Sequence, residues 1–247
     1  MNIYPFDEQL IEVQFNARPG AETPLVVAHR LRKPTLQELL EREQGVSLEI
    51  HEVSNREDTI VSDDEGANCR LWDKLILQAR GYRGMADWTP LDDNQKAEMR
   101  PGHKSTAIRG MYAGTASVAN DDDDGVSLSG DTWAIRHVIG ADAENPQYEI
   151  LHVLREPTEG ERSKFKRAAS SAHIVRGGKK SRTKIVTSLK AFVELYDALV
   201  IDITGGTVAG QYLSHDNRAQ FLAAIDPTWK RLVVQTLLNA IEAALLD

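Results

Sequence analysis

Apolar and polar residues alternate in two separate stretches of the chain, residues 24–32 (PLVVAHRLR) and 147–155 (QYEILHVLR). Both stretches are rich in β-branched or aromatic residues, which is typical of β-strands. A proline follows each of them, Pro34 or Pro157. Because proline has no N–H to donate to a sheet, each predicted strand ends at this point.

A helix is predicted directly after each proline. Thr35 is followed three positions later by Glu38, and Thr158 in the same way by Glu161. This spacing is a capping box, in which the hydroxyl accepts from the third helical amide and the carboxylate accepts from the cap amide. The eight-residue segments that begin at residues 31 (LRKPTLQE) and 154 (LREPTEGE) share five identities. We interpret the common LRxPTxxE pattern as a strand-to-helix corner with a structural role.

The two regions stay similar beyond the corner. Residues 47–62 and 171–187 each predict two short strands around a polar turn. Residues 71–82 and 195–206 have apolar residues at helical spacing and predict helices that end near a glycine. The common order indicates an α+β protein with an internally duplicated strand–helix–hairpin–helix unit. Chance similarity of two capped helices is the alternative.

The remaining segments complete the expected organisation. A short helix is predicted after Pro90, residues 100–110 are predicted to be a loop, and two amphipathic helices are predicted after residue 214. In the second of these helices, Asp226 suits the N-cap and Pro227 the first turn. We therefore expect two α+β halves, residues 1–118 and 132–247, joined by an acidic linker at 119–131, with the C-terminal helices closing the core or forming an oligomer contact.

The two predicted hairpins carry opposite charges. The first hairpin region holds a cluster of acidic residues, Glu49, Glu52, Glu57, Asp58, Asp63, Asp64 and Glu65. Its counterpart and the helix before it hold basic residues, which are the candidate partner-binding set: Arg162, Lys164, Lys166, Arg167, Arg176, Lys179, Lys180, Arg182 and Lys184. Complementary patches of this kind favour self-association, within one chain or head-to-tail between chains. Two independently solvated hairpins, an acidic protein partner and nucleic acid are the alternatives.

Overall composition limits the class of protein. The net charge of −8 over 247 residues argues against a general nucleic-acid-binding protein. Cys69 is the one cysteine, so an internal disulfide and a cysteine-rich metal site are excluded. The chain has no apolar stretch long enough for a membrane span and no basic start typical of a signal peptide, and we expect a cytoplasmic protein.

One acidic segment resembles a calcium-binding loop. Asn120, Asp122, Asp124, Gly125 and Asp131 occupy positions 1, 3, 5, 6 and 12 of the D-x-D-x-D-G-x₅-E pattern. Oxygen ligands at alternate positions can surround one Ca²⁺ ion. The pattern departs at position 1, which is Asn, and at position 12, where Asp is shorter than Glu. A solvated acidic turn explains the same residues, and Ca²⁺ is the one candidate cofactor.

No motif for catalysis is found. The glycine-rich segments 176–184 and 203–210 lack the spacing of phosphate-binding loops, and no G-x-S-x-G serine is present. His29 and His152 lie in the matching strands, where a strand-surface or core position is a better explanation than a ligand. Cys69 lies in a predicted helix and is expected to pack. We expect a non-enzymatic protein, although an active site assembled from distant residues is an alternative.

The LRxPT corners at residues 31–35 and 154–158 resemble a recurring feature of small tail assembly chaperones encoded by tailed phages and prophages. The resemblance covers the corners and the helices that follow them. It implies a non-enzymatic assembly or virion-associated protein with a protein partner such as a tape measure or tail tube component. The present chain is larger than those chaperones and carries the corner twice.

Overall fold

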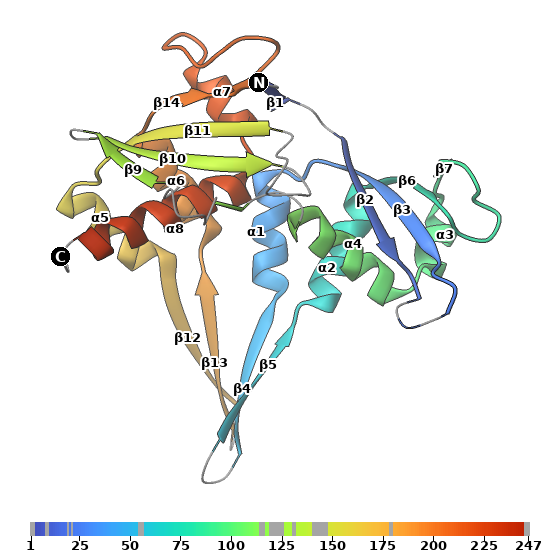
Figure 1. Ribbon diagram of the computed structural model, residues 1–247. Helices are drawn as coiled ribbons and strands as arrows, with labels where there is room; N and C mark the ends of the chain where they lie inside the picture. The colour runs from blue at the N-terminus through green and yellow to red at the C-terminus, as the bar shows by residue number, and fades with distance from the viewer. Residues whose placement is uncertain are drawn as a thin grey trace. The chain divides into compact units, whose positions relative to one another are not determined.

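The computed structural model describes residues 3–7, 10–18, 20, 22–53, 57–113, 117–118, 126–129, 132–139, 148–177 and 180–244 (Figure 1). Helices and antiparallel sheets are both present, which confirms the α+β class. By its internal contacts the chain divides into two units. Unit 1 comprises Met1–Glu8, Gly114–Ala169 and Ser188–Asp247, and unit 2 comprises Gln9–Ala113 and Ser170–Thr187. The predicted halves 1–118 and 132–247 stay a prediction.

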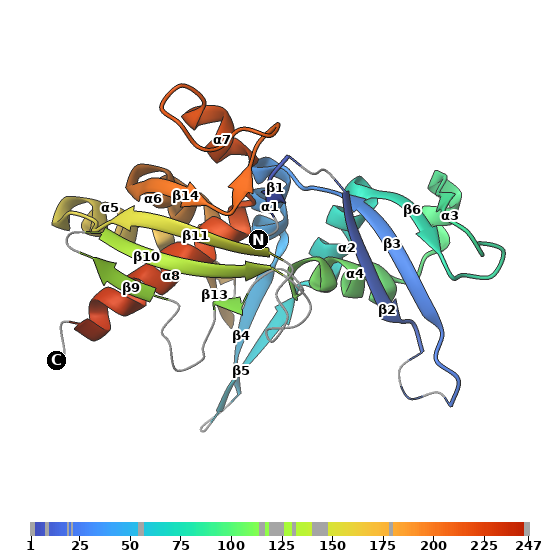
Figure 2. The ribbon, with the colours of Figure 1, turned by 45° about the horizontal axis from the view of Figure 1, so that its top comes forward.

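Unit 2 is built on a four-stranded antiparallel sheet in the order β2-β3-β6-β7. Helices α2 and α4 pack on this sheet and on each other, and α1 packs against α2 (Figures 1 and 2). The hairpin β4–β5 connects α1 to α2, and the short helix predicted after Pro90 is α3. The bounds are β2 Leu10–Asn16, β3 Val26–Arg32, α1 Leu36–Gly45, β4 Ser47–Val53, β5 Glu57–Asp63, α2 Glu65–Leu75, β6 Ile76–Arg80, β7 Thr89–Pro90, α3 Asp93–Glu98 and α4 Pro101–Ala113.

Unit 1 is built on an antiparallel sheet in the order β14-β11-β10-β8, with β9 also paired to β10. Helices α6 and α8 pack together, α8 lies against β10, and α5 packs against α6. A small parallel pair joins β1 to β15. The bounds are β1 Tyr4–Pro5, β8 Ser117–Val118, β9 Val126–Ser129, β10 Thr132–Ile139, β11 Tyr148–Arg155, α5 Glu159–Ala169, α6 Leu189–Leu199, β14 Val200–Thr204, β15 Gly206–Thr207, α7 Arg218–Ala224 and α8 Pro227–Ala244.

The second hairpin connects α5 to α6, and by its contacts it belongs to unit 2. It consists of β12 Ser170–Gly177 and β13 Lys180–Thr187, paired antiparallel. Within unit 2, β13 lies beside β4. The backbones of the basic and the acidic hairpin therefore come together inside one chain.

The two units share a pattern of strand pairing. Strands β2, β3 and β6 pair in the same order as β10, β11 and β14, and all these pairings are antiparallel. The register shifts at the same place in both units, between Arg30 and Leu31 in β3 and between Val153 and Leu154 in β11. The predicted strands, hairpins and C-terminal helices are confirmed as elements, whereas their common origin stays a prediction.

The helices predicted at residues 71–82 and 195–206 are wrong in their second halves. Helix α2 ends at Leu75 and α6 at Leu199, and the next residue of each has an extended backbone. Residues 76–80 and 200–204 instead form strands β6 and β14. Each of these strands pairs with the central strand of its unit, β3 or β11.

The glycine after each of these strands ends a strand rather than a helix. Gly81 and Gly205 have φ angles of 87° and 85°, which favour glycine. A Cβ on Gly81 would lie 2.4 Å from the carbonyl oxygen of Val26, and one on Gly205 would lie 2.0 Å from that of Glu149. A side chain is therefore excluded at both positions by the backbone of the neighbouring strand.

The loop predicted at residues 100–110 is also wrong, because this segment forms helix α4. Its buried apolar residues Ala107, Ile108 and Met111 have helical spacing and pack into unit 2. Gly110 allows close approach to the sheet, since a Cβ there would lie 2.6 Å from Cγ1 of Val13. Polar residues dominate the segment otherwise and obscure this pattern in the sequence.

Both LRxPTxxE corners form the predicted capping boxes. The amide of Thr35 donates to Glu38 at 2.9 Å and that of Thr158 to Glu161 at the same distance. The corner arginine adds a second contact, because Arg32 donates to Glu38 at 2.9 Å and Arg155 to Glu161 at 2.8 Å. Hydrogen bonds from these arginines, together with the threonine contacts, lower the pKa of Glu38 and of Glu161 to about 2.

The corner generates a test of stability. Replacing the capping hydroxyl, as in Thr35→Ala or Thr158→Ala, should lower the free energy of unfolding by about 1 kcal/mol, because a helix amide loses its acceptor. Urea denaturation followed by circular dichroism measures this change. Ser163→Ala, an exposed substitution inside α5, is the matched control and should have a smaller effect. Equal stability of the Thr158→Ala variant and the wild type would contradict the capping role.

Candidate functional site

A buried hydrogen-bonded cluster connects the sheet of unit 2 to its helices. His29 of β3 is fully buried, and its Nδ1 accepts a hydrogen bond from Nε1 of Trp72 at 3.0 Å. The Nε2 atom of His29 lies 2.9 Å from the hydroxyl of Tyr82. Because the indole N–H can only donate, Nδ1 of His29 carries no proton and Nε2–H donates to Tyr82. One imidazole tautomer is thus fixed by the tryptophan.

The cluster extends toward the surface through Tyr82, whose hydroxyl lies 3.4 Å from Nδ1 of the half-buried His103. Burial, and secondarily the neighbouring His103, lowers the pKa of His29 to about 4. Burial also raises the pKa of the Tyr82 hydroxyl. His29 and Tyr82 are therefore neutral near pH 7. The hydrogen bonds of both side chains go to other residues of the chain. This arrangement favours a structural role over acid–base catalysis.

Unit 1 has a matching cluster. His152 of β11 is fully buried, and its Nδ1 lies 2.7 Å from the hydroxyl of Tyr196 in α6. Its Nε2 lies 3.4 Å from Nδ1 of the buried His137 in β10. Burial lowers the pKa of His152 and raises that of Tyr196. Of the two positions predicted for His29 and His152, strand surface or core, both histidines occupy the core.

A buried lysine supports the helix aromatic in each unit. Lys104 of α4 lies over the ring of Trp72 and donates to Asp73 at 2.6 Å. Lys230 of α8 lies over the ring of Tyr196 and donates to Asp197 at 2.6 Å. Each ammonium is thus held by one carboxylate and one aromatic face. These lysines tie the C-terminal helix of each unit to its neighbour.

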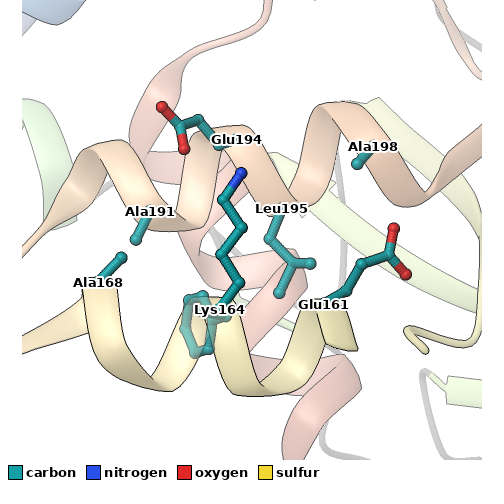
Figure 3. Close-up of a pocket in the computed structure, with 8 residues that line it drawn as sticks. Glu161, Lys164, Ala168, Ala191, Glu194, Leu195 and Ala198 are labelled. Carbon is teal, nitrogen blue, oxygen red and sulfur yellow. The ribbon is translucent and has the colours of Figure 1, made fainter. Parts of the chain in front are cut away.

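The strongest candidate for a binding site is a groove between α5 and α6 of unit 1 (Figure 3). Its volume is about 130 Å³. Apolar residues form most of the lining and charged residues stand at the rim. We call it the α5–α6 groove, lined by Glu161, Lys164, Phe165, Ala168, Ala191, Glu194, Leu195 and Ala198.

Unit 2 has a cavity between the corresponding helices, α1 and α2, but with different chemistry. It measures about 90 Å³ and is lined mostly by charged residues. An ion pair between Lys74 and Glu41, with 2.5 Å between Nζ and Oε2, joins the two helices. Arg42 from the same lining donates to Asn68 at 2.7 Å. The lining consists of Glu38, Glu41, Arg42, Ala67, Arg70, Leu71 and Lys74.

The predicted basic set is divided between the units. Four of its members lie on α5 in unit 1, where Arg162 contacts Glu156 and the others are exposed: Arg162, Lys164, Lys166 and Arg167. Four lie on the strands of the second hairpin: Arg176, Lys180, Arg182 and Lys184. Lys179 lies outside the described residues. The role of this set in partner binding stays a prediction.

The predicted calcium ligands Asn120, Asp122, Asp124 and Asp131 lie outside the described residues. Within the described ranges, no group of three or more His, Cys, Asp or Glu residues could hold a metal ion. Cys69 is half-buried in α2, and burial raises the pKa of its thiol. Where the structure describes the chain, no helix combines the length and apolar character needed to cross a bilayer.

The groove was missed by sequence reasoning, although its residues were part of predicted helices. Phe165 and Leu195 are spaced as core residues, and the alanines carry no chemical signal of their own. The groove arises only because α5 packs against α6 after the intervening hairpin. The basic character of α5 was the one available signal.

The buried histidines generate a prediction about acid stability. The pKa of His29 is about 4 in the folded protein, lowered by burial from 6.5. Between pH 6.5 and about 4 the unfolded chain binds more protons, so stability falls as the pH falls through this window. The loss from His29 is about 3 kcal/mol, and His152 acts in the same direction.

Urea midpoints measured from pH 7.5 to 4.5 check this expectation. His29→Gln should have a flatter pH profile than the wild type, whatever its absolute stability. His215→Gln, at a fully exposed position, should keep the wild-type slope. A His29→Gln profile parallel to that of the wild type would show that His29 does not titrate as described.

Comparison with known proteins adds no family: no protein-family model, no curated protein and no solved structure matches the chain. The functional assignment therefore depends on the geometry of the described residues and on the corner pattern.

Proposed function

We propose that this protein is a non-enzymatic assembly protein of a phage or prophage tail module, which acts through protein–protein contacts. The observation that carries the proposal is the position of β13 beside β4. These strands belong to the basic and the acidic hairpin, so segments whose sequences carry opposite charge are neighbours within one chain. A second copy offers the same pair of surfaces, and head-to-tail association would use them between chains.

Charge makes this association specific. The strands β4 and β5 include five acidic residues, and β12 and β13 include four basic ones. Opposite patches speed encounter and fix register, and their effect weakens with salt. The acidic residues are Glu49, Glu52, Glu57, Asp58 and Asp63, and the basic ones are Arg176, Lys180, Arg182 and Lys184.

The strand pattern shared by the two units supports descent from one duplicated module. Each unit begins its helical part with the LRxPTxxE corner that resembles tail assembly chaperones, and each corner has the same Arg–Glu contact. The buried polar clusters also favour a scaffold over an enzyme. His29 contacts Tyr82 and His152 contacts Tyr196 within these clusters, and the α5–α6 groove is mainly apolar.

Sedimentation velocity at low and high salt tests the proposal. Reversing Lys179, Lys180 and Arg182 to Glu should shift the oligomeric state at low salt, because the basic hairpin then repels the acidic one. A second variant, in which Glu49, Glu52 and Asp58 are also reversed to Lys, should restore the wild-type state. An oligomeric state that is unchanged by the first variant at every salt concentration would refute hairpin-driven association.

The tail-module assignment has a separate test. Co-expression with the products of the flanking genes should yield a stable complex with a tape measure or tail tube component. A gene neighbourhood without tail or capsid genes would overturn this part of the proposal.

A further inference from the structure

The α5–α6 groove is open, apolar and large enough to take a side chain from another molecule. Its volume of about 130 Å³ is close to the cavities of about 150 Å³ that bind a benzene-sized group. Phe165 and Leu195 supply an apolar floor. One bulky apolar side chain, such as leucine or phenylalanine, would therefore be buried there.

Small residues let a partner approach the two helices closely. Ala168 of α5 and Ala198 of α6 are exposed at opposite ends of the groove, and Ala191 is buried beside Ala168 (Figure 3). None of these side chains extends beyond Cβ. A partner helix can then lie along the groove with its anchor pointing inward, as in other helix-in-groove complexes.

The charges around the groove select an acidic partner. Glu161 is occupied by Arg155 and the amide of Thr158, and Glu194 lies 3.8 Å from Lys190. By contrast, Lys164 of the groove lining is exposed and has no ion-pair partner in the part of the chain that the structure describes, and Lys166 and Arg167 are exposed elsewhere on α5. The charge left for an incoming molecule is therefore positive.

The cavity in unit 2 shows that two helices can pair in this way without an apolar groove between them. There the Lys74–Glu41 ion pair joins the helices and charged side chains fill the lining. Equivalent packing of α1 on α2 is thus stable without an open apolar groove. In the α5–α6 groove, Ala191 and Leu195 also belong to the core of unit 1, whereas Ala168 and Ala198 are exposed at the opening.

We infer that the α5–α6 groove is a docking site for an acidic amphipathic helix of a partner protein, with one bulky apolar side chain inserted between Phe165 and Leu195. The inference rests on the proposed function, because it assigns a partner class to a protein that acts by protein contacts. It uses a surface separate from the hairpins.

Fluorescence anisotropy with a labelled model peptide tests the site on the full chain. The probe is a capped helical peptide of leucine and glutamate with leucine at positions i, i+4 and i+7. Its sister peptide has lysine in place of every glutamate. The acidic peptide should bind saturably, and the basic one should bind at least about tenfold more weakly, which corresponds to about 1.4 kcal/mol.

Groove variants locate the binding. Ala198→Phe fills the groove and Lys164→Glu reverses its charge, and each should weaken binding of the acidic peptide about tenfold or more. Lys74→Glu, in the unit 2 cavity, is the matched control and should leave binding unchanged. Circular dichroism confirms that each variant folds, and replacing the peptide's leucines by alanine removes the anchor without altering the protein.

Other outcomes would overturn the inference. Equal binding of both peptides, or binding unaffected by Ala198→Phe and Lys164→Glu, would exclude the groove. Displacement of the acidic peptide by single-stranded DNA, with a steep salt dependence, would identify a phosphate-binding surface instead. Any of these results combined with charge-dependent sedimentation would remove the docking site and leave the hairpin proposal intact.

Discussion

The structure depends on one buried hydrogen bond in each unit, between an imidazole of the central strand and an aromatic side chain of the helix above it. His29 bonds Trp72 in unit 2, and His152 lies within hydrogen-bond distance of Tyr196 in unit 1. In an interior without water a missing partner costs about 1–3 kcal/mol, so this contact fixes how the helix sits on the sheet. The lysine–carboxylate pair on the same aromatic then fixes the last helix.

Local signals in the sequence identify part of this fold. The corners are predictable because a proline, a threonine and a glutamate act over a few residues, and the structure has both capping boxes. The strands after α2 and α6 are not predictable in this way. Residues 76–80 and 200–204 continue the apolar pattern of the helix before them. They form strands because they pair with the free edge of β3 or β11, which lies far away in the sequence. Helix α4 is hidden for a related reason, since its three buried apolar residues stand among many polar ones.

Less of the candidate site could be predicted. The basic character of α5 is visible in the sequence, whereas the groove needs the pairing of α5 with α6 across a hairpin of 18 residues, Ser170 to Thr187. The alanines that line the groove give no signal in the sequence, because their role depends on which residues lie beside them. Similarly, the tautomer of His29 follows from the indole of Trp72, which is distant in the chain. The groove and the tautomer of His29 thus depend on contacts between residues far apart in the sequence. Patterns in a single sequence indicate mainly contacts between neighbouring residues.

The base of the second hairpin is closed by a hydrogen bond from the amide of Ser188 to the carbonyl of Ala169. This hydrogen bond joins the end of α5 to the start of α6. The two helices are therefore held together at the base of the hairpin. The hairpin beyond this hydrogen bond can consequently change in length or in charge while the helices and the buried imidazole contact stay unchanged. The length and charge of this hairpin are therefore set independently of the helix pair that carries it.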